Sequence, residues 1–201
     1  MSDGFIIKRG GGSGDSNAAF KAYVDGSLTE VTADMLQGIT SIRNYAFYHC
    51  SSLASVTIPS GVTSIGQLAF QSCSSLTSIT IPNNVTSISN SAFSACINLA
   101  SITIPNNVTS IGRSAFNGCS SLTSITIPNN VTSIGDEAFR YNGNLESVTV
   151  KATTPPTLGF GVFYNVSSNL VIYVPAESVD AYKAATNWST YADKIQAIPS
   201  D

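Results

Sequence analysis

The stretch SLTSITIPNNVTSISNSAFSAC, residues 75–96, decides the fold, because the chain repeats it almost unchanged. Similar copies begin at Ser52, Asn98 and Ser121, so that each copy starts 23 residues after the previous one. A fixed period of this size is the signature of a solenoid, in which each coil buries its apolar side against the next coil. The sequence therefore predicts one stacked array rather than a conventional globular domain.

The first half of each copy predicts a short strand. Leu76, Ile79 and Ile81 form the L-x-x-L-x-L pattern of a leucine-rich repeat. Apolar and polar residues alternate here, so Ile79 and Ile81 are expected to point inward and Ser78 and Thr80 outward. A proline ends the strand in four copies, and the Ser-Gly or Asn-Asn pair that follows is expected to turn the chain with positive φ. These prolines are Pro59, Pro82, Pro105 and Pro128.

The second half of each copy completes the coil. Val85 and Ile88 are expected to be buried in a second extended piece, and Ala92, Phe93 and Cys96 are spaced as in one turn of helix. Stacking places like residues above one another, which predicts an internal aromatic column and a column of buried free thiols. The aromatic column comprises Phe47, Phe70, Phe93, Phe116 and Phe139, and the thiol column comprises Cys50, Cys73, Cys96 and Cys119.

The ends of the chain depart from the repeat. We expect three parts: an N-terminal segment with a Gly-rich joint (1–27), a solenoid (28–175) and a C-terminal helical cap (176–201). The first unit, from Leu28, carries two extra residues, and LVIYVP (170–175) is expected to be the final strand. In the N-terminal segment, FIIK (5–8) predicts a short strand and Asp25–Gly26 a hairpin turn. The apolar residues of the expected amphipathic cap, which is broken near Asn187, are Val179, Tyr182, Trp188, Tyr191 and Ile195.

These observations predict a right-handed leucine-rich-repeat solenoid of parallel short strands and 23-residue repeats, with a C-terminal helical cap. The units SLTSITIPNNVTSIGDEAF (121–139) and their neighbours resemble the BspA-like leucine-rich-repeat family. The tail YVPAESVDAYKAATNWSTYADKI (173–195) is similar to a terminal region common in that family. The resemblance covers roughly residues 28–198 and implies binding rather than chemistry, since such proteins are mostly bacterial surface or secreted adhesins, or are encoded by bacteriophages.

The charged residues argue against an enzyme. No acidic residue lies between Asp34 and Asp136, and the only basic residues there are Arg43 and Arg113. About a hundred residues therefore lack a carboxylate pair for acid–base work. His49 is the sole histidine, and the cysteines recur once per repeat rather than as C-x-x-C pairs. We therefore expect no catalytic residue, no metal site and no cofactor.

The composition also restricts partners and location. The net charge of −3 and the scattered Lys and Arg residues offer no basic surface for nucleic acid. No apolar run is long enough to span a bilayer, so membrane insertion is not expected. The first residues do not resemble a secretory signal. A secreted, cell-surface or virion-associated location is nevertheless favoured by the family resemblance.

The outward columns of hydroxyl side chains form the candidate ligand-binding surface. Their regular spacing on one side of the predicted strands gives a nearly neutral platform for hydrogen bonds to a protein or a glycan. A solely structural interpretation, in which these residues keep the sheet solvated, stays open. The candidate residues are Ser55, Thr57, Ser78, Thr80, Ser101, Thr103, Ser124, Thr126, Ser147 and Thr149.

Three functions compete at this point. The first is a non-enzymatic protein- or glycan-binding or adhesion module. The second is a structural or assembly subunit, such as a phage tail-associated protein or a surface spacer, joined through its Gly-rich N-terminus. The third, ice binding, is disfavoured because the columns lack a strict Thr-x-Thr motif. The NVT triplets at Asn84, Asn107 and Asn130 match glycosylation acceptors, but the repeat produces all three from one sequence, and a turn role after proline explains them fully. The ligand and the oligomeric state stay open.

Overall fold

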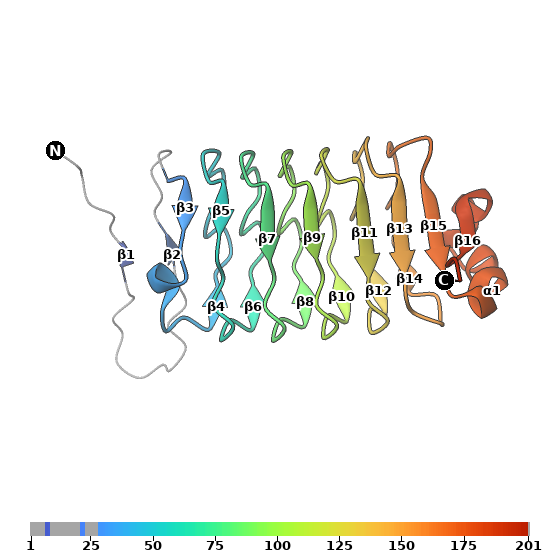
Figure 1. Cartoon of the computed structure of the whole chain (residues 1–201), viewed down its shortest axis with the longest axis horizontal. Helices are drawn as coiled ribbons and strands as arrows, with labels where there is room; N and C mark the ends of the chain where they lie inside the picture. Colours follow the sequence, from blue (N-terminus) through green and yellow to red (C-terminus); the bar gives the residue numbers. More distant parts are fainter. Residues whose placement is uncertain (1–6, 9–20, 23–27, 201) are drawn as a thin grey trace.

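The computed structural model describes residues 7–8, 21–22 and 28–200, and it is an elongated stack of coils (Figure 1). Each complete coil places one short strand in each of two rows. The leucine-rich-repeat solenoid and the C-terminal helix expected from the sequence are both present.

The first row of strands carries the outward Ser and Thr columns. Its members pair in parallel in the orders β3-β5-β7-β9 and β11-β13-β15-β16. Along β7 the side chains alternate between exposed and buried, with Ile79 inside and Ser78 and Thr80 outside, which confirms the expected orientation. We call the outer surface of this row the strand face. The strands are β3 (Glu30–Val31), β5 (Ser55–Val56), β7 (Ser78–Thr80), β9 (Ser101–Thr103), β11 (Ser124–Ile127), β13 (Ser147–Val150), β15 (Val171–Val174) and β16 (Ile195–Ala197).

The second row comes from the V-T-S-I pieces. Val85 and Ile88 are buried as expected. The strands pair in parallel in the orders β4-β6 and β8-β10-β12-β14. They are β4 (Ser41–Ile42), β6 (Ser64–Ile65), β8 (Ser87–Ile88), β10 (Ser110–Ile111), β12 (Ser133–Ile134) and β14 (Thr157–Leu158).

The first coil accommodates its two extra residues in a short helix. Val31 pairs with Val56, 25 positions later, whereas Ile42 pairs with Ile65, 23 positions later. The 3₁₀ helix η1 (Asp34–Leu36) lies between these two strands. The insertion is therefore absorbed locally, and the pairs from β5 to β13 return to a spacing of 23 residues. The pairs of β12 with β14 and of β13 with β15 are spaced by 24 residues, so one further residue is inserted near the C-terminal end.

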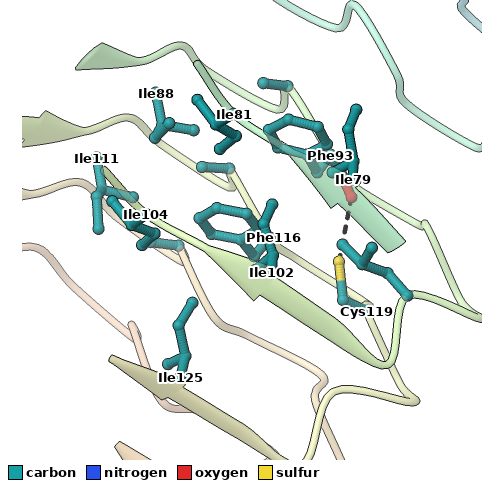
Figure 2. Packing of buried hydrophobic residues seen from close by; sticks show 14 of the residues in the cluster. Ile79, Ile81, Ile88, Phe93, Ile102, Ile104, Ile111, Phe116, Cys119 and Ile125 are labelled. Carbon is teal, nitrogen blue, oxygen red and sulfur yellow. Dashed lines mark hydrogen bonds between the residues drawn. The ribbon is translucent and has the colours of Figure 1, made fainter. Parts of the chain in front are cut away.

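The expected aromatic column runs through the core (Figure 2). Phe93 and Phe116 are fully buried, with ring centroids 5.5 Å apart and ring planes within 4° of parallel. The column continues past Phe139 to Phe163, whose ring meets the edge of Tyr191 in the cap at 5.3 Å. Because aromatic rings bury large apolar areas, this column is a main source of stability.

The helical turn expected at Ala92, Phe93 and Cys96 is wrong. The segment is instead a run of tight turns, in which Ser91 and Ala95 adopt positive φ values of 53° and 57°. The amides of Ser91, Phe93 and Ala95 donate to carbonyls of the next coil at 2.7–2.9 Å. The alternate amides donate within the segment, from Ala92 to the Ser89 carbonyl and from Ser94 to the Ser91 carbonyl at 3.2 Å, so the continuous i→i−4 ladder of an α-helix does not form. We call this third side of the solenoid the turn face.

The turn after each proline also differs from its prediction. The amide of Val85 donates to the carbonyl of Pro82 at 3.0 Å, so a turn does form. However, the described residues with positive φ do not include the asparagines that follow the prolines. Their side chains act between coils instead, and the Asn84 amide Nδ2 donates to the Ser60 carbonyl at 2.8 Å. Asn107 and Asn130 make equivalent bonds at 2.7 Å.

The cap covers the last coil through buried aromatic residues. The Trp188 indole N–H donates to the Pro156 carbonyl, and the Tyr182 hydroxyl donates to the Ala152 carbonyl, both at 2.8 Å. Asn187, at φ 65°, provides the expected break. The cap consists of η2 (Ala176–Ser178), α1 (Val179–Ala184) and η3 (Trp188–Lys194).

Two expectations for the C-terminal region are wrong. Ile195 lies in strand β16 rather than in a helix, and it pairs with Ile172 of β15. LVIYVP (170–175) is therefore not the final strand, because the chain returns from the cap to add one more strand to the first row.

The N-terminal segment is described only in part. Strands β1 (Ile7–Lys8) and β2 (Lys21–Ala22) pair antiparallel, with Ile7 opposite Ala22. The strand expected within residues 5–8 is thus present at 7–8. The Gly-rich joint and the turn expected at Asp25–Gly26 lie outside the described residues.

Candidate ligand-binding surface

The structure brings the ten predicted hydroxyl residues together on the strand face. Strand pairing sets Ser78 beside Ser101 and Thr80 beside Thr103, so the side chains form two columns. Eight of the ten residues are exposed, and Ser147 and Thr149 are half-buried near the cap. The parallel ladder thus turns a sequence repeat into a regular polar surface.

The hydroxyl groups of the strand face have no side-chain hydrogen bond to any residue in the range 28–200. The second row provides the contrast, because the hydroxyls of Thr63, Thr109 and Thr132 each donate to a carbonyl of the preceding coil at 3.2 Å. Those threonines help to join coils. The hydroxyls of the strand face are left for water or for a ligand.

The strand face contains a depression of about 370 Å³ over strands β9 and β11. These strands are neighbours in the row (Figure 1), yet they end two separate hydrogen-bonded sheets and do not pair with each other. We call this interruption the seam. Its polar lining consists of Ser101, Thr103, Asn106, Ser124, Thr126 and Lys151.

Lys151 is the residue that departs from the repeat in this depression. It follows β13 at the position that Pro128 holds one coil earlier. Its amide donates to the Ile127 carbonyl at 3.0 Å, a bond that proline could not make. The residue is exposed and lines the depression. One cation is therefore placed beside the hydroxyl columns.

The turn face carries a second group of exposed residues, which the sequence analysis missed. The Arg140 guanidinium carbon lies 4.6 Å from the Tyr141 ring centroid and 4.9 Å from that of Tyr164. Arg140 also donates to the Glu137 carboxylate, and its Nη2 donates to the Tyr141 hydroxyl at 2.9 Å. Phe160, whose carbonyl accepts a hydrogen bond from the Glu137 amide at 2.9 Å, is 80% exposed. Such arginines and tyrosines are common in protein interfaces.

A departure from the repeat was the available signal for this aromatic group. Glu137, Arg140 and Tyr141 occupy the positions of Ser114, Asn117 and Gly118 in the preceding coil. Large or charged residues that replace small ones at half-buried or exposed repeat positions are not required by the stack. They are therefore candidates for a function outside the fold.

The cysteines and the single histidine lie apart from these surfaces. The Cys96 and Cys119 thiols are buried and donate to carbonyls of the preceding coil at 3.1 Å, and burial raises the pKa of Cys119 to about 12. His49 is exposed, with its ring 4.2 Å from that of Tyr48. Within the described part of the chain, no group of three or more His, Cys, Asp or Glu residues is placed to hold a metal ion. Nor does that part contain a helix with the length and apolar character needed to cross a membrane.

Comparison with solved structures supports the same architecture. A leucine-rich repeat protein of T. pallidum (TpLRR) is 26% identical, with a TM-score of 0.71 over 100% of this chain and 99% of that one. The pneumococcal vaccine antigen PcpA is 17% identical, with a TM-score of 0.63 over 91% of this chain and 47% of that one, and this likeness concerns the fold alone.

A family model supplies the assignment. No curated protein matches the sequence significantly. The model of the BspA type leucine-rich repeat region, with six copies, matches residues 25–175, which is most of the chain. The chain therefore belongs to the BspA-type leucine-rich repeat family.

Proposed function

We propose that the chain is a non-enzymatic binding module whose strand face contacts a protein or glycan ligand. The observation that carries this proposal is the set of strand-face hydroxyls, which are mostly exposed and make no side-chain hydrogen bond to residues 28–200. The comparable threonines of the second row use their hydroxyls within the fold. A rigid array of free donors and acceptors meets a ligand with little loss of conformational entropy.

The proposed location is the bacterial surface or the outside of the cell. One structural relative, PcpA, is described as a vaccine antigen. That likeness concerns the fold alone, so the proposed location rests on the resemblance to a family of mostly bacterial surface or secreted proteins. The low density of charge on the solenoid means that shape and hydrogen bonds would dominate affinity, so binding should depend only weakly on salt.

The test is a triple substitution that blocks the strand face. Thr80, Thr103 and Thr126 are changed together to Gln, because a long neutral side chain fills the face without adding charge. The matched control changes Ser64, Ser87 and Ser110 to Gln on the second row, where the side chains also point outward. Both variants and the wild type are applied to a printed glycan array and to immobilised fibronectin, fibrinogen and laminin.

The proposal expects the wild type to bind at least one of these targets, the strand-face variant to lose that binding, and the control to keep it. Circular dichroism must show that both variants are folded. Binding that survives in a folded strand-face variant would move the contact to the turn face or to the cap. A wild type that binds none of the targets and forms a defined oligomer in light scattering would replace the proposal with the assembly-subunit function.

A further inference from the structure

We infer that the depression at the seam between β9 and β11 binds a carboxylate-bearing sugar residue, such as a uronic acid. The inference rests on the proposed function and names the ligand class of one part of the strand face. Three features of the depression support it: its charge, its hydroxyl groups and its interrupted strand pairing.

The charge of the depression calls for an anion. Lys151 is the one ionisable residue in its lining, and no acidic residue lines it. The chain between Asp34 and Asp136 supplies both strands and contains no acid that could neutralise the lysine locally. Among residues 28–200, the ion pairs join Glu137 to arginines and leave the Lys151 ammonium group unpaired. A carboxylate group of a ligand would provide the missing partner.

The remaining lining favours a sugar over an acidic peptide side chain. Ser101, Thr103, Ser124 and Thr126 each present a hydroxyl that both donates and accepts hydrogen bonds. The hydroxyl groups of a pyranose ring have the same dual character, so they can be matched over the whole depression. A glutamate or aspartate side chain can only accept, and it would leave the acceptor capacity of these groups unused.

The seam distinguishes this site from the rest of the strand face. Elsewhere in the row the strands pair side by side, but β9 and β11 do not pair with each other. Because backbone N–H and C=O groups require partners, a strand edge without a ladder is a place where a ligand can provide them. The volume of about 370 Å³ lies within the range of small-ligand sites, which is about 300–1,000 Å³. No other pair of neighbouring strands on the strand face combines an interruption with a lysine in the described structure.

The experiment is a titration of the ¹⁵N-labelled full chain, followed by heteronuclear NMR. The probe is a galacturonic acid trimer. Its fully methyl-esterified form keeps the rings and removes the charge, and a triglutamate peptide keeps the charge and removes the sugar hydroxyls. Lys151→Gln is the test variant, and Lys183→Gln, at an exposed position of α1, is the matched control.

We expect the acidic trimer to shift the amide signals of Ser101, Thr103, Ser124 and Thr126. Loss of a single partly exposed ion pair should raise the dissociation constant about five-fold in Lys151→Gln, with no change in Lys183→Gln. The methyl ester should bind the wild type as weakly as the acid binds Lys151→Gln. Triglutamate should bind more weakly than the acidic trimer.

Absence of shifts at the seam, or equal affinity in the wild type and Lys151→Gln, would overturn the inference. Equal binding of triglutamate and the trimer would overturn the assignment to a sugar. A failure here leaves the wider function separately testable, because loss of array or matrix-protein binding in the Thr-to-Gln variant does not require an acidic sugar.

Discussion

Asn142→Cys should stabilise the protein. Asn142 is fully buried and lies where Cys119 lies one coil earlier. Its Nδ2 donates to the Phe116 carbonyl at 3.0 Å, just as the Cys119 thiol donates to the Phe93 carbonyl at 3.1 Å. Its Oδ1, however, has no hydrogen-bond partner among the described residues. The asparagine thus makes the bond of the thiol column but leaves one buried acceptor unsatisfied.

The magnitude follows from two opposing effects. A buried polar group without a partner costs about 1–3 kcal/mol, and cysteine removes that group. The thiol is a weaker hydrogen-bond donor than the amide, and this difference reduces the gain in stability by about 0.5–1 kcal/mol. The side chains are similar in volume, so little repacking is needed. We expect a net gain of about 1 kcal/mol, or about 2–4 °C in Tm for a chain of this length.

The assay is guanidinium unfolding of Asn142→Cys and the wild type in reducing buffer, followed by circular dichroism. The reciprocal variant Cys119→Asn serves as the control, because it creates a second unsatisfied acceptor and should lower stability. An Asn142→Cys protein that is no more stable than the wild type would show that Oδ1 is already satisfied by water. The reasoning that Asn142 keeps an unsatisfied buried acceptor would then be refuted.

Four further outcomes are expected. Phe93→Ala should lose about 3–5 kcal/mol of unfolding free energy, and a melting temperature within a degree of wild type would contradict the aromatic column. Gly112→Ala should lose about 1–3 kcal/mol of unfolding free energy, because the added Cβ would lie 2.7 Å from the backbone nitrogen of Asn90. Gly143 has open space around it, so Gly143→Ala should change little in the same denaturation assay. Burial raises the pKa of Cys50 to about 11, above the value of about 8.5 for an unfolded thiol. The thiols therefore contribute stability below about pH 8.5 that is lost as the pH rises towards 11, and Ellman's reagent should detect four thiols at pH 8 only after denaturation without reductant. Dialysis against EDTA should leave Tm unchanged, and a drop of several degrees in calorimetry would reveal a structural metal ion.

The features that could be predicted are those that the sequence of a single repeat determines. The alternation of Ile79 and Ile81 with Ser78 and Thr80 requires one buried side in any strand, whatever lies next to it. Repetition then places Phe93 in a column, because identical coils can only stack like upon like.

The conformation of the turn face could not be predicted, because the same spacing fits two structures. Ala92, Phe93 and Cys96 would share one side of a helix, and they also share the inner side of the observed turns. The hydrogen bonds from Ser91 and Ala95 to the next coil decide between these structures. They join residues more than twenty positions apart, so no local pattern records them.

The candidate site, too, was predictable only in part from the sequence. The sequence by itself determined which side of the strands carries the hydroxyls, and it marked Lys151 as a departure from proline. Only the tertiary structure decided where the ladder is interrupted, because Ser-Ile-Thr-Ile is identical at 78–81, 101–104 and 124–127, the stretches that contain β7, β9 and β11. The depression combines two coils with a lysine from a third. Its position depends on how neighbouring coils stack, which is a property of the array and not of any one repeat.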